Sequence, residues 1–277
     1  MTSMDKGMHK ERVNGQLSNR RRSVYLSLFL TIFIMISGCY PNSNVNDPLR
    51  LLWNKSGEKT DKLIIFLPGL NQAAETFEKA QFFTIARQMG VKADFLAASV
   101  HIDHLFEQKL IERLQKDIFS HLYAQGYKNI WLVGMSLGGL NSLLFYSERP
   151  DAVCGVVVLA PFLAGSNLTK EIKKAGGIKK WIPTPEKEDL LPGQEVVEQH
   201  KLWQWIKNEK NKKYLDKVYL GYGDKDVYVE SIKMFENFLP AKNVVTLPGY
   251  HKLKTGIRIW TQQLKTRKET GLLSSCH

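Results

Sequence analysis

Short apolar runs of strand length recur along the chain. They occupy residues 62–67, 93–100, 130–133, 153–160, 217–222 and 243–247. Most are apolar on both faces instead of alternating with polar residues, and continuous apolar runs are typical of buried parallel strands. The run at 153–160 is the most completely apolar, so we expect a central place in the sheet for it.

Helical spacing fills the gaps between several of these runs. Residues 75–89 place Phe82, Ala86 and Met89 on one face and end at a glycine, and residues 111–122 carry a second apolar stripe. Strands that alternate with helices form a parallel sheet with right-handed crossovers and helices on both faces. In such a sheet, chemistry belongs at the carboxyl ends of the strands.

The N-terminal region has a different pattern. Three arginines, Arg20 to Arg22, precede thirteen mostly apolar residues at 24–36. A helix of that length would reach only about 20 Å, which is too short for a bilayer core of about 30 Å. Basic residues, an apolar stretch and then small residues instead predict a secretory signal over residues 1–38.

The end of this signal is more specific. Ile36-Ser37-Gly38-Cys39 resembles the lipobox of bacterial lipoproteins, which implies that Cys39 is acylated and becomes the first residue of the mature chain. An ordinary signal peptide or an uncleaved anchor is the alternative. Tyr40, in place of an aspartate, implies the outer membrane by the same resemblance. We therefore expect lipid anchoring to the bacterial envelope, with residues 39–60 as a polar tether.

The net charge limits the kinds of binding partner to expect, and the cysteine positions bear on disulfide formation. The net charge is +12, of which the first 38 residues supply +4, so +8 remains to favour anionic surfaces. No zinc-finger spacing or other nucleic-acid module accompanies this charge, and we expect no nucleic-acid partner. Cys154 lies in an apolar run and Cys276 is next to the last residue, so no bridge between them is expected.

The candidate nucleophile follows the strand-like run at 130–133. Gly134-Met135-Ser136-Leu137-Gly138 is followed by a helix-compatible run from Leu140. This strand, tight turn and helix resemble the nucleophile elbow, G-x-S-x-G, of the α/β-hydrolase family. The resemblance implies that Ser136 is the nucleophile. It also implies that the amides of Leu137 and of Leu70, which follows Pro68-Gly69, stabilise an oxyanion; for Leu70 a plain turn is the alternative.

A serine nucleophile needs a base and an acid that orients the base. The family order is serine, acid, histidine, and only His200, His251 and His277 follow Ser136. His251 is the candidate base because it follows a strand-like run through a short turn. The family pattern G-x-x-D-x-x-V fits Gly223, Asp226 and Val229, which favours Asp226 as the acid over its neighbour Asp224.

Two other segments carry residues with possible chemical roles. His101, Asp103 and His104 have a spacing compatible with a metal, but no further ligand stands nearby, so we predict no metal and no cofactor. Residues 162–216 exceed an ordinary crossover, and the resemblance implies a cap over the pocket. Its lysines and tryptophans fit an acyl chain or a lipid surface, although the tryptophans could equally pack the cap onto the sheet.

Together these features predict an α/β-hydrolase fold at residues 61–268, with a mostly parallel sheet, a helical cap insertion at about 162–216 and a tail at 269–277. The expected activity is that of a serine esterase or lipase acting on a small-molecule or lipid carboxylic ester, with thioesterase and peptidase activities open. The alternative is a protein without enzymatic activity: a lipoprotein with a catalytically idle hydrolase fold that serves as a binding or scaffolding protein in the envelope. The sequence carries no indication of the oligomeric state.

Overall fold

The computed structural model describes residues 44–183 and 197–276. The chain divides into two units, Met1–Asn44 and Val45–His277, and every element below belongs to the second. The predicted signal over residues 1–38 and the lipidation site Cys39 lie outside the described residues. Within the described ranges, no helix is both long and apolar enough to cross a membrane.

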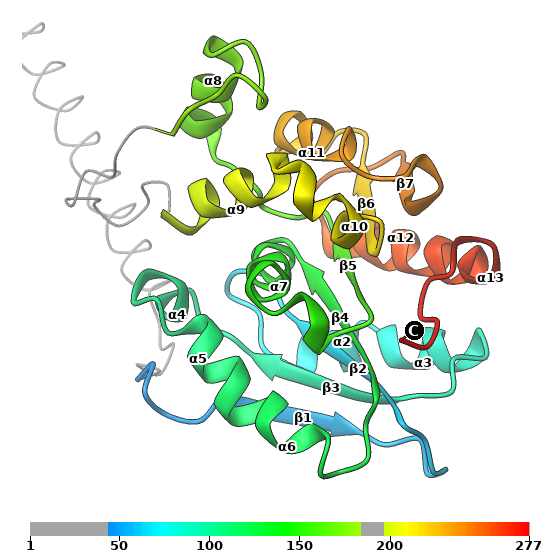
Figure 1. The fold of residues 1–277 in the computed structure, drawn as a ribbon. Helices are drawn as coiled ribbons and strands as arrows, with labels where there is room; N and C mark the ends of the chain where they lie inside the picture. The colour runs from blue at the N-terminus through cyan, green and yellow to red at the C-terminus, as the bar shows by residue number, and fades with distance from the viewer. Residues whose placement is uncertain (1–43, 184–196, 277) are drawn as a thin grey trace, which may run out of the picture. The chain divides into compact units, whose positions relative to one another are not determined.

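A seven-stranded sheet forms the centre of this unit (Figure 1). Its order is β1-β3-β2-β4-β5-β6-β7, with β1 antiparallel to β3 and all other neighbours parallel. The strands are β1 (Arg50–Asn54), β2 (Lys62–Leu67), β3 (Asp94–Ser99), β4 (Asn129–Met135), β5 (Gly155–Leu159), β6 (Val218–Gly223) and β7 (Val244–Leu247). The mostly parallel sheet predicted from the apolar runs is confirmed.

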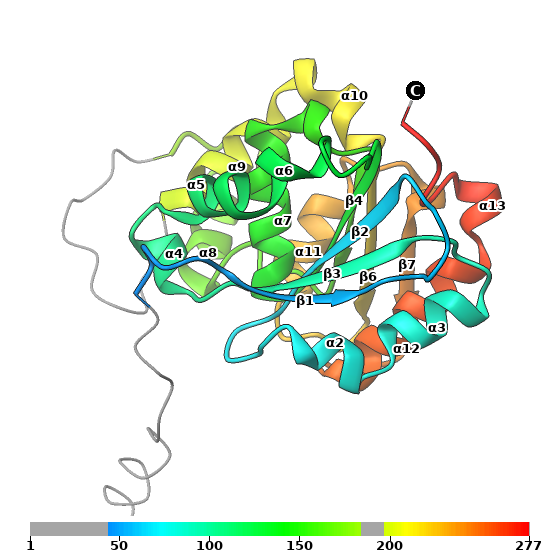
Figure 2. The same cartoon turned by 90° about the horizontal axis from the view of Figure 1, so that it is seen from below.

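Helices cover both faces of the sheet (Figure 2). One face carries α4 (Asp103–Phe106), α5 (Leu110–Leu114), α6 (Ser120–Leu122), α7 (Leu137–Glu148), α8 (Ser166–Lys174), α9 (Val197–Lys207), α10 (Lys212–Leu215) and α11 (Val229–Glu236). The other carries α2 (Glu75–Lys79), α3 (Phe82–Gln88) and α12 (Leu253–Lys265), and the short α13 (Arg267–Thr270) follows α12. Two apolar cores result, one on each face, and strands buried on both faces explain the continuous apolar runs.

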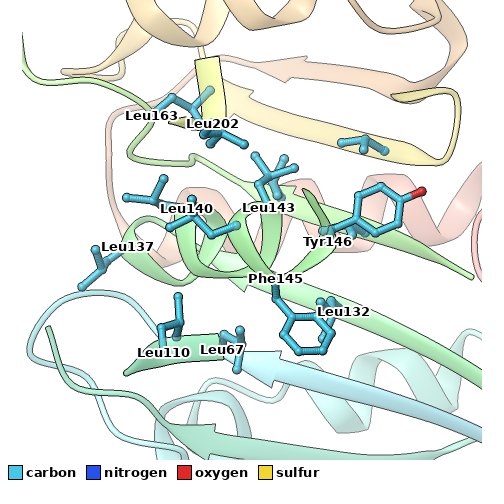
Figure 3. Packing of buried hydrophobic residues seen from close by; sticks show 14 of the residues in the cluster. Leu67, Leu110, Leu132, Leu137, Leu140, Leu143, Phe145, Tyr146, Leu163 and Leu202 are labelled. Carbon is cyan, nitrogen blue, oxygen red and sulfur yellow. The ribbon is translucent and has the colours of Figure 1, made fainter. Parts of the chain in front are cut away.

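The two cores differ in composition. On the α7 side, Leu140 and Leu143 lie opposite Leu163 and Leu202 of the insertion (Figure 3). On the α12 side the core is aromatic, with the ring of Phe66 surrounded by phenylalanines and by Trp260 at a centroid distance of 5.9 Å. Large rings packed edge to face add stabilisation beyond the area that they bury. The strands that carry the candidate site therefore rest on well-packed layers.

Three local expectations are corrected. The helix predicted over 75–89 is two helices, α2 and α3, because Gln81 between them has a left-handed φ of 62°. The helix predicted over 111–122 is interrupted by a π-helical turn at Gln115–Phe119. The predicted tether at 39–60 contains β1, whose Leu51 to Trp53 are half-buried against β3. Apolar spacing alone shows neither a one-residue break nor a short edge strand.

The prediction that Cys154 and Cys276 are not bridged is wrong. The two residues form a disulfide with their Cα atoms 4.8 Å apart, although 122 positions separate them in sequence. The C-terminal segment returns to the sheet after α13: Lys62 donates to the carbonyl of Leu273 at 2.7 Å, and the Trp131 indole to that of Ser274 at 2.9 Å. These contacts bring the chain end to the start of β5, which its position in sequence does not reveal.

The insertion between β5 and β6 holds α8, α9, the 3-10 helix η3 (Glu209–Asn211) and α10. Its helix α9 packs on α7, the helix that follows Ser136, and the buried Trp203 indole donates to the carbonyl of Leu163 at 3.0 Å. Trp181 is also buried, and its indole donates to the Glu171 carboxylate at 2.7 Å. The tryptophans of the insertion thus contribute to its own packing.

Candidate active site

Ser136, His251 and Asp226 form a continuous hydrogen-bonded row. The Ser136 hydroxyl lies 2.9 Å from Nε2 of His251, and Nδ1 of His251 lies 2.9 and 3.0 Å from the two carboxylate oxygens of Asp226. The three residues follow β4, β6 and β7, so parallel strands bring their carboxyl ends to the same edge of the sheet. Residues 115 and 25 positions apart meet here because of that topology.

Ser136 itself stands in a sharp turn between β4 and α7. Its φ of 54° and ψ of −117° are unusual for a residue with a side chain, and such strain concentrates at functional sites. Glycines make the turn possible, because a Cβ at Gly134 would stand 2.1 Å from the carbonyl oxygen of Gly138. The hydroxyl is thereby held at the end of the strand, partly open to solvent.

Of the two candidate acids, the structure brings Asp226 and not Asp224 to the histidine. Asp226 is 3% exposed, and its Oδ1 also accepts the amide of Tyr228 at 2.8 Å. Asp224 is exposed and accepts the amide of Gly249 at 2.9 Å, which ties the loop after β6 to the loop after β7. Asp224 therefore holds the loop of His251 without touching its ring.

The loop after β2 lies against the serine. A Cβ at Gly69 would stand 3.3 Å from the Cβ of Ser136, while the Gly69 amide donates to the Gln72 side chain at 3.1 Å. The next residue, Leu70, has an exposed side chain. Leu137 is the first residue of α7, and the first N–H groups of a helix have no acceptor within it. Both predicted oxyanion donors thus belong to segments next to Ser136.

Comparisons with known proteins give a coherent result for the fold. No protein-family model and no curated protein matches the chain. Among solved structures, a ferulic acid esterase superposes with a TM-score of 0.52 at 11% identity, over 81% of this chain and 99% of that one. FphF, a fluorophosphonate-binding serine hydrolase of Staphylococcus aureus, superposes with a TM-score of 0.52 at 12% identity, over 79% and 98%. The chain has an α/β-hydrolase fold.

Two aromatic residues of this α/β-hydrolase fold were not predicted to belong to the site. The ring of Tyr228 stands edge-on to the imidazole of His251 with centroids 5.0 Å apart, and the ring of Phe162 lies 4.8 Å from that of Tyr228. Burial, followed by the nearby charge of Asp226, raises the pKa of the Tyr228 hydroxyl. A signal was present in the sequence, since Tyr228 stands two positions after Asp226 and Phe162 stands two positions after the run at 153–160.

His101, Asp103 and His104 follow β3 at the same edge of the α/β-hydrolase sheet. His101 pairs with Asp103 at 2.8 Å, and Nδ1 of His104 lies 3.1 Å from the His101 carbonyl. His104 is buried, and this burial lowers the pKa of its imidazole. Across residues 44–183 and 197–276, no three His, Cys, Asp or Glu side chains gather as a metal site would require. The contacts within this turn are local and shape the loop.

Proposed function

We propose that this protein is a serine hydrolase of carboxylic esters. The observation that carries the proposal is the hydrogen-bonded row from Ser136 through His251 to Asp226 at the carboxyl edge of an α/β-hydrolase sheet. A histidine within 2.9 Å of a serine hydroxyl and a buried carboxylate on its other nitrogen are the geometry that serine catalysis needs. Thioester or amide cleavage would use the same groups.

The first half of the reaction forms an acyl-enzyme. Ser136 Oγ attacks the ester carbonyl carbon while His251 Nε2 takes the hydroxyl proton. The carbonyl oxygen becomes an oxyanion, which the amides of Leu137 and Leu70 stabilise as donors in the turn and in the loop after β2. Collapse of this tetrahedral intermediate breaks the bond to the alcohol, which leaves with the proton from His251.

The second half restores the enzyme. His251 takes a proton from water, which attacks the acyl carbon, and collapse of the second intermediate releases the carboxylic acid and returns the proton to Ser136. Asp226 stays ionised throughout, fixes the tautomer of His251 and stabilises the imidazolium. Its buried position and its bond from the Tyr228 amide hold the carboxylate in place for this role.

The proposed location is the bacterial cell envelope, with the chain anchored through acylated Cys39, as the lipobox-like sequence predicts. The Cys154–Cys276 disulfide supports a compartment outside the reducing cytosol. Mass spectrometry of the mature N-terminus tests the anchor: the expected product begins at an acylated Cys39, whereas a free Cys39 or an intact residue 30 contradicts it.

Labelling with a fluorophosphonate probe tests the proposed activity. We expect labelling and hydrolysis of p-nitrophenyl esters that disappear in Ser136→Ala and persist in Ser147→Ala, a matched change within α7. A chain-length series of esters and thioesters, with and without lipid vesicles, then identifies the acyl group. Absence of Ser136-dependent labelling and of hydrolysis above the Ser136→Ala background would favour the idle scaffold instead.

A further inference from the structure

A cavity lies away from the catalytic row. It has a volume of about 610 Å³ and is lined by the turn after α8, the ends of α9 and α11, and α10. Helix α11 begins at Val229, three residues after Asp226, and the cavity lies at its other end, where Asn237 lines it. At 1.5 Å per residue, that end lies about 12 Å along the helix from its start. The cavity is therefore distinct from the site of the proposed reaction.

The inner wall of this cavity is apolar. Ile178, Ile206 and Leu215 are buried, and Met234 and Phe238 pack partly buried against the same core. Their positions are set by the packing of the insertion against the body of the domain. An apolar wall of this size within a concave site is typical of pockets that bury a small molecule.

The rim of the cavity is cationic. Lys179, Lys180 and Lys212 are exposed, and no ion pair among the described residues involves them. A fourth lysine, Lys207, donates to the carbonyl of Trp181 at 2.5 Å, and Glu209 is the acidic member of the lining. The four lysines and Glu209 give the lining a net charge of +3. The three exposed lysines are not paired with any described carboxylate and can attract an anion.

We propose that this cavity binds a long-chain carboxylate, the anion of a fatty acid. The hydrocarbon tail would cover the apolar wall, and the carboxylate would stand among the lysines of the rim. An uncharged hydrocarbon ligand would make no ion pair with the lysine ammonium groups. A small inorganic anion would leave the apolar side chains of the wall exposed to water. This pairing of wall and rim selects one amphiphile with one negative end. The proposal does not rest on the proposed esterase activity.

Displacement of cis-parinaric acid from full-length Ser136→Ala protein tests the proposal without turnover. We expect dodecanoate to displace the probe at concentrations at least about ten-fold lower than dodecanol, because the alcohol lacks the charge. Affinity is expected to rise by up to about four-fold per added methylene from octanoate to dodecanoate. Raising the salt concentration is expected to weaken carboxylate binding but not alcohol binding.

Variants identify the site. Replacing Lys179, Lys180 and Lys212 by glutamine is expected to weaken dodecanoate binding about ten-fold and leave dodecanol unchanged. The matched control replaces the exposed Lys170, Lys174 and Lys201 of the same insertion, which do not line the cavity, and is expected to stay within about two-fold. Met234→Trp, checked for an unchanged melting temperature, is expected to remove binding of both ligands by filling the cavity.

Several results would overturn the proposal. These are equal affinity for dodecanoate and dodecanol, equal losses in the two lysine variants, displacement by inorganic phosphate alone, or loss of binding in wild-type protein whose Ser136 is blocked by a fluorophosphonate. The last would place the ligand in the catalytic site. Failure of ester hydrolysis in the wild type would leave these binding results standing, so the two proposals are tested separately.

Discussion

Gly138 of α7 lies so close to Leu67 of β2 that a Cβ on the glycine would stand 1.9 Å from the leucine carbonyl oxygen. The added Cβ would be fixed to the backbone of α7, and the oxygen that it meets belongs to the backbone of the central sheet, so neither could move aside easily. The first turn of α7 therefore approaches the sheet more closely than any other residue type permits. Through this contact the packing of β2 sets the position of Ser136.

Gly138→Ala is accordingly expected to displace α7, with a loss of about 3 kcal/mol or more in the free energy of unfolding and loss of ester hydrolysis. Urea unfolding measures the first effect. Gly256→Ala in α12 is the control, because its Cβ would meet only the flexible end of Met135, and a change within about 1 kcal/mol is expected. Equal stability of the two variants would contradict the packing argument.

Replacement of the two aspartates distinguishes their roles. Asp226→Asn keeps the shape of the side chain but removes the negative charge that faces Nδ1 of His251. We therefore expect kcat to fall by about 10³ to 10⁴. Asp224→Asn keeps an acceptor for the Gly249 amide, so kcat is expected to stay within about five-fold of wild type. Similar kcat values for the two variants would contradict the assignment of Asp226 as the acid.

Leu70→Pro tests the second oxyanion donor, because proline has no backbone N–H. We expect kcat to fall by about 10² to 10³. Leu70→Ala keeps the amide and changes only an exposed side chain, so its kcat should remain near that of wild type. Single-turnover measurements of acylation, together with far-UV circular dichroism of both variants, separate loss of the donor from misfolding of the loop. A proline variant with full activity would remove Leu70 from the mechanism.

The disulfide is expected to stabilise the domain substantially. It closes a loop of 122 residues, for which the chain-entropy argument gives about 5 kcal/mol. A protein with both Cys154→Ala and Cys276→Ala should lose that amount in chemical unfolding, and reduction of the wild type should match it. Folded protein carrying Cys39→Ser should show no free thiol. Detection of two reactive thiols there would contradict the bridge.

Asp94 is expected to contribute stability that disappears in acid. Burial acts to raise the pKa of its carboxyl, but hydrogen bonds from Tyr127 (2.5 Å) and Ser56 (2.6 Å), with the charge of Lys55, outweigh it and lower the pKa. Because the folded pKa lies below the unfolded value, this stabilisation is present above about pH 4 and is lost as the pH falls through the folded pKa.

Tyr127→Phe removes one of these hydrogen bonds. We expect a loss of about 1 to 3 kcal/mol at pH 7 and a smaller loss at pH 3, measured by urea unfolding at both values. Tyr123→Phe, a change at an exposed tyrosine, is the control and should have little effect at either pH. An equal loss for Tyr127→Phe at both pH values would show that the carboxylate charge does not matter there.

Much of this fold was predictable because local patterns carry it. The runs at 62–67 and 153–160 correspond to β2 and β5 within a few residues, since buried parallel strands must be apolar on both faces. The turn around Ser136 was visible because it demands glycines at set positions. The family order and the family pattern G-x-x-D-x-x-V then favoured His251 and Asp226 as candidates, and in the structure His251 lies between Ser136 and Asp226, within hydrogen-bond distance of each.

The amino-acid sequence by itself determined the strands, the glycine turn and the short list of chemical groups, because these depend on neighbours within a few positions. Only the tertiary structure decided which of Asp224 and Asp226 reaches His251, that Cys154 and Cys276 meet, and that lysines of the insertion surround an apolar cavity. Each of these depends on distances between segments far apart in the chain, and those distances follow from how the layers pack.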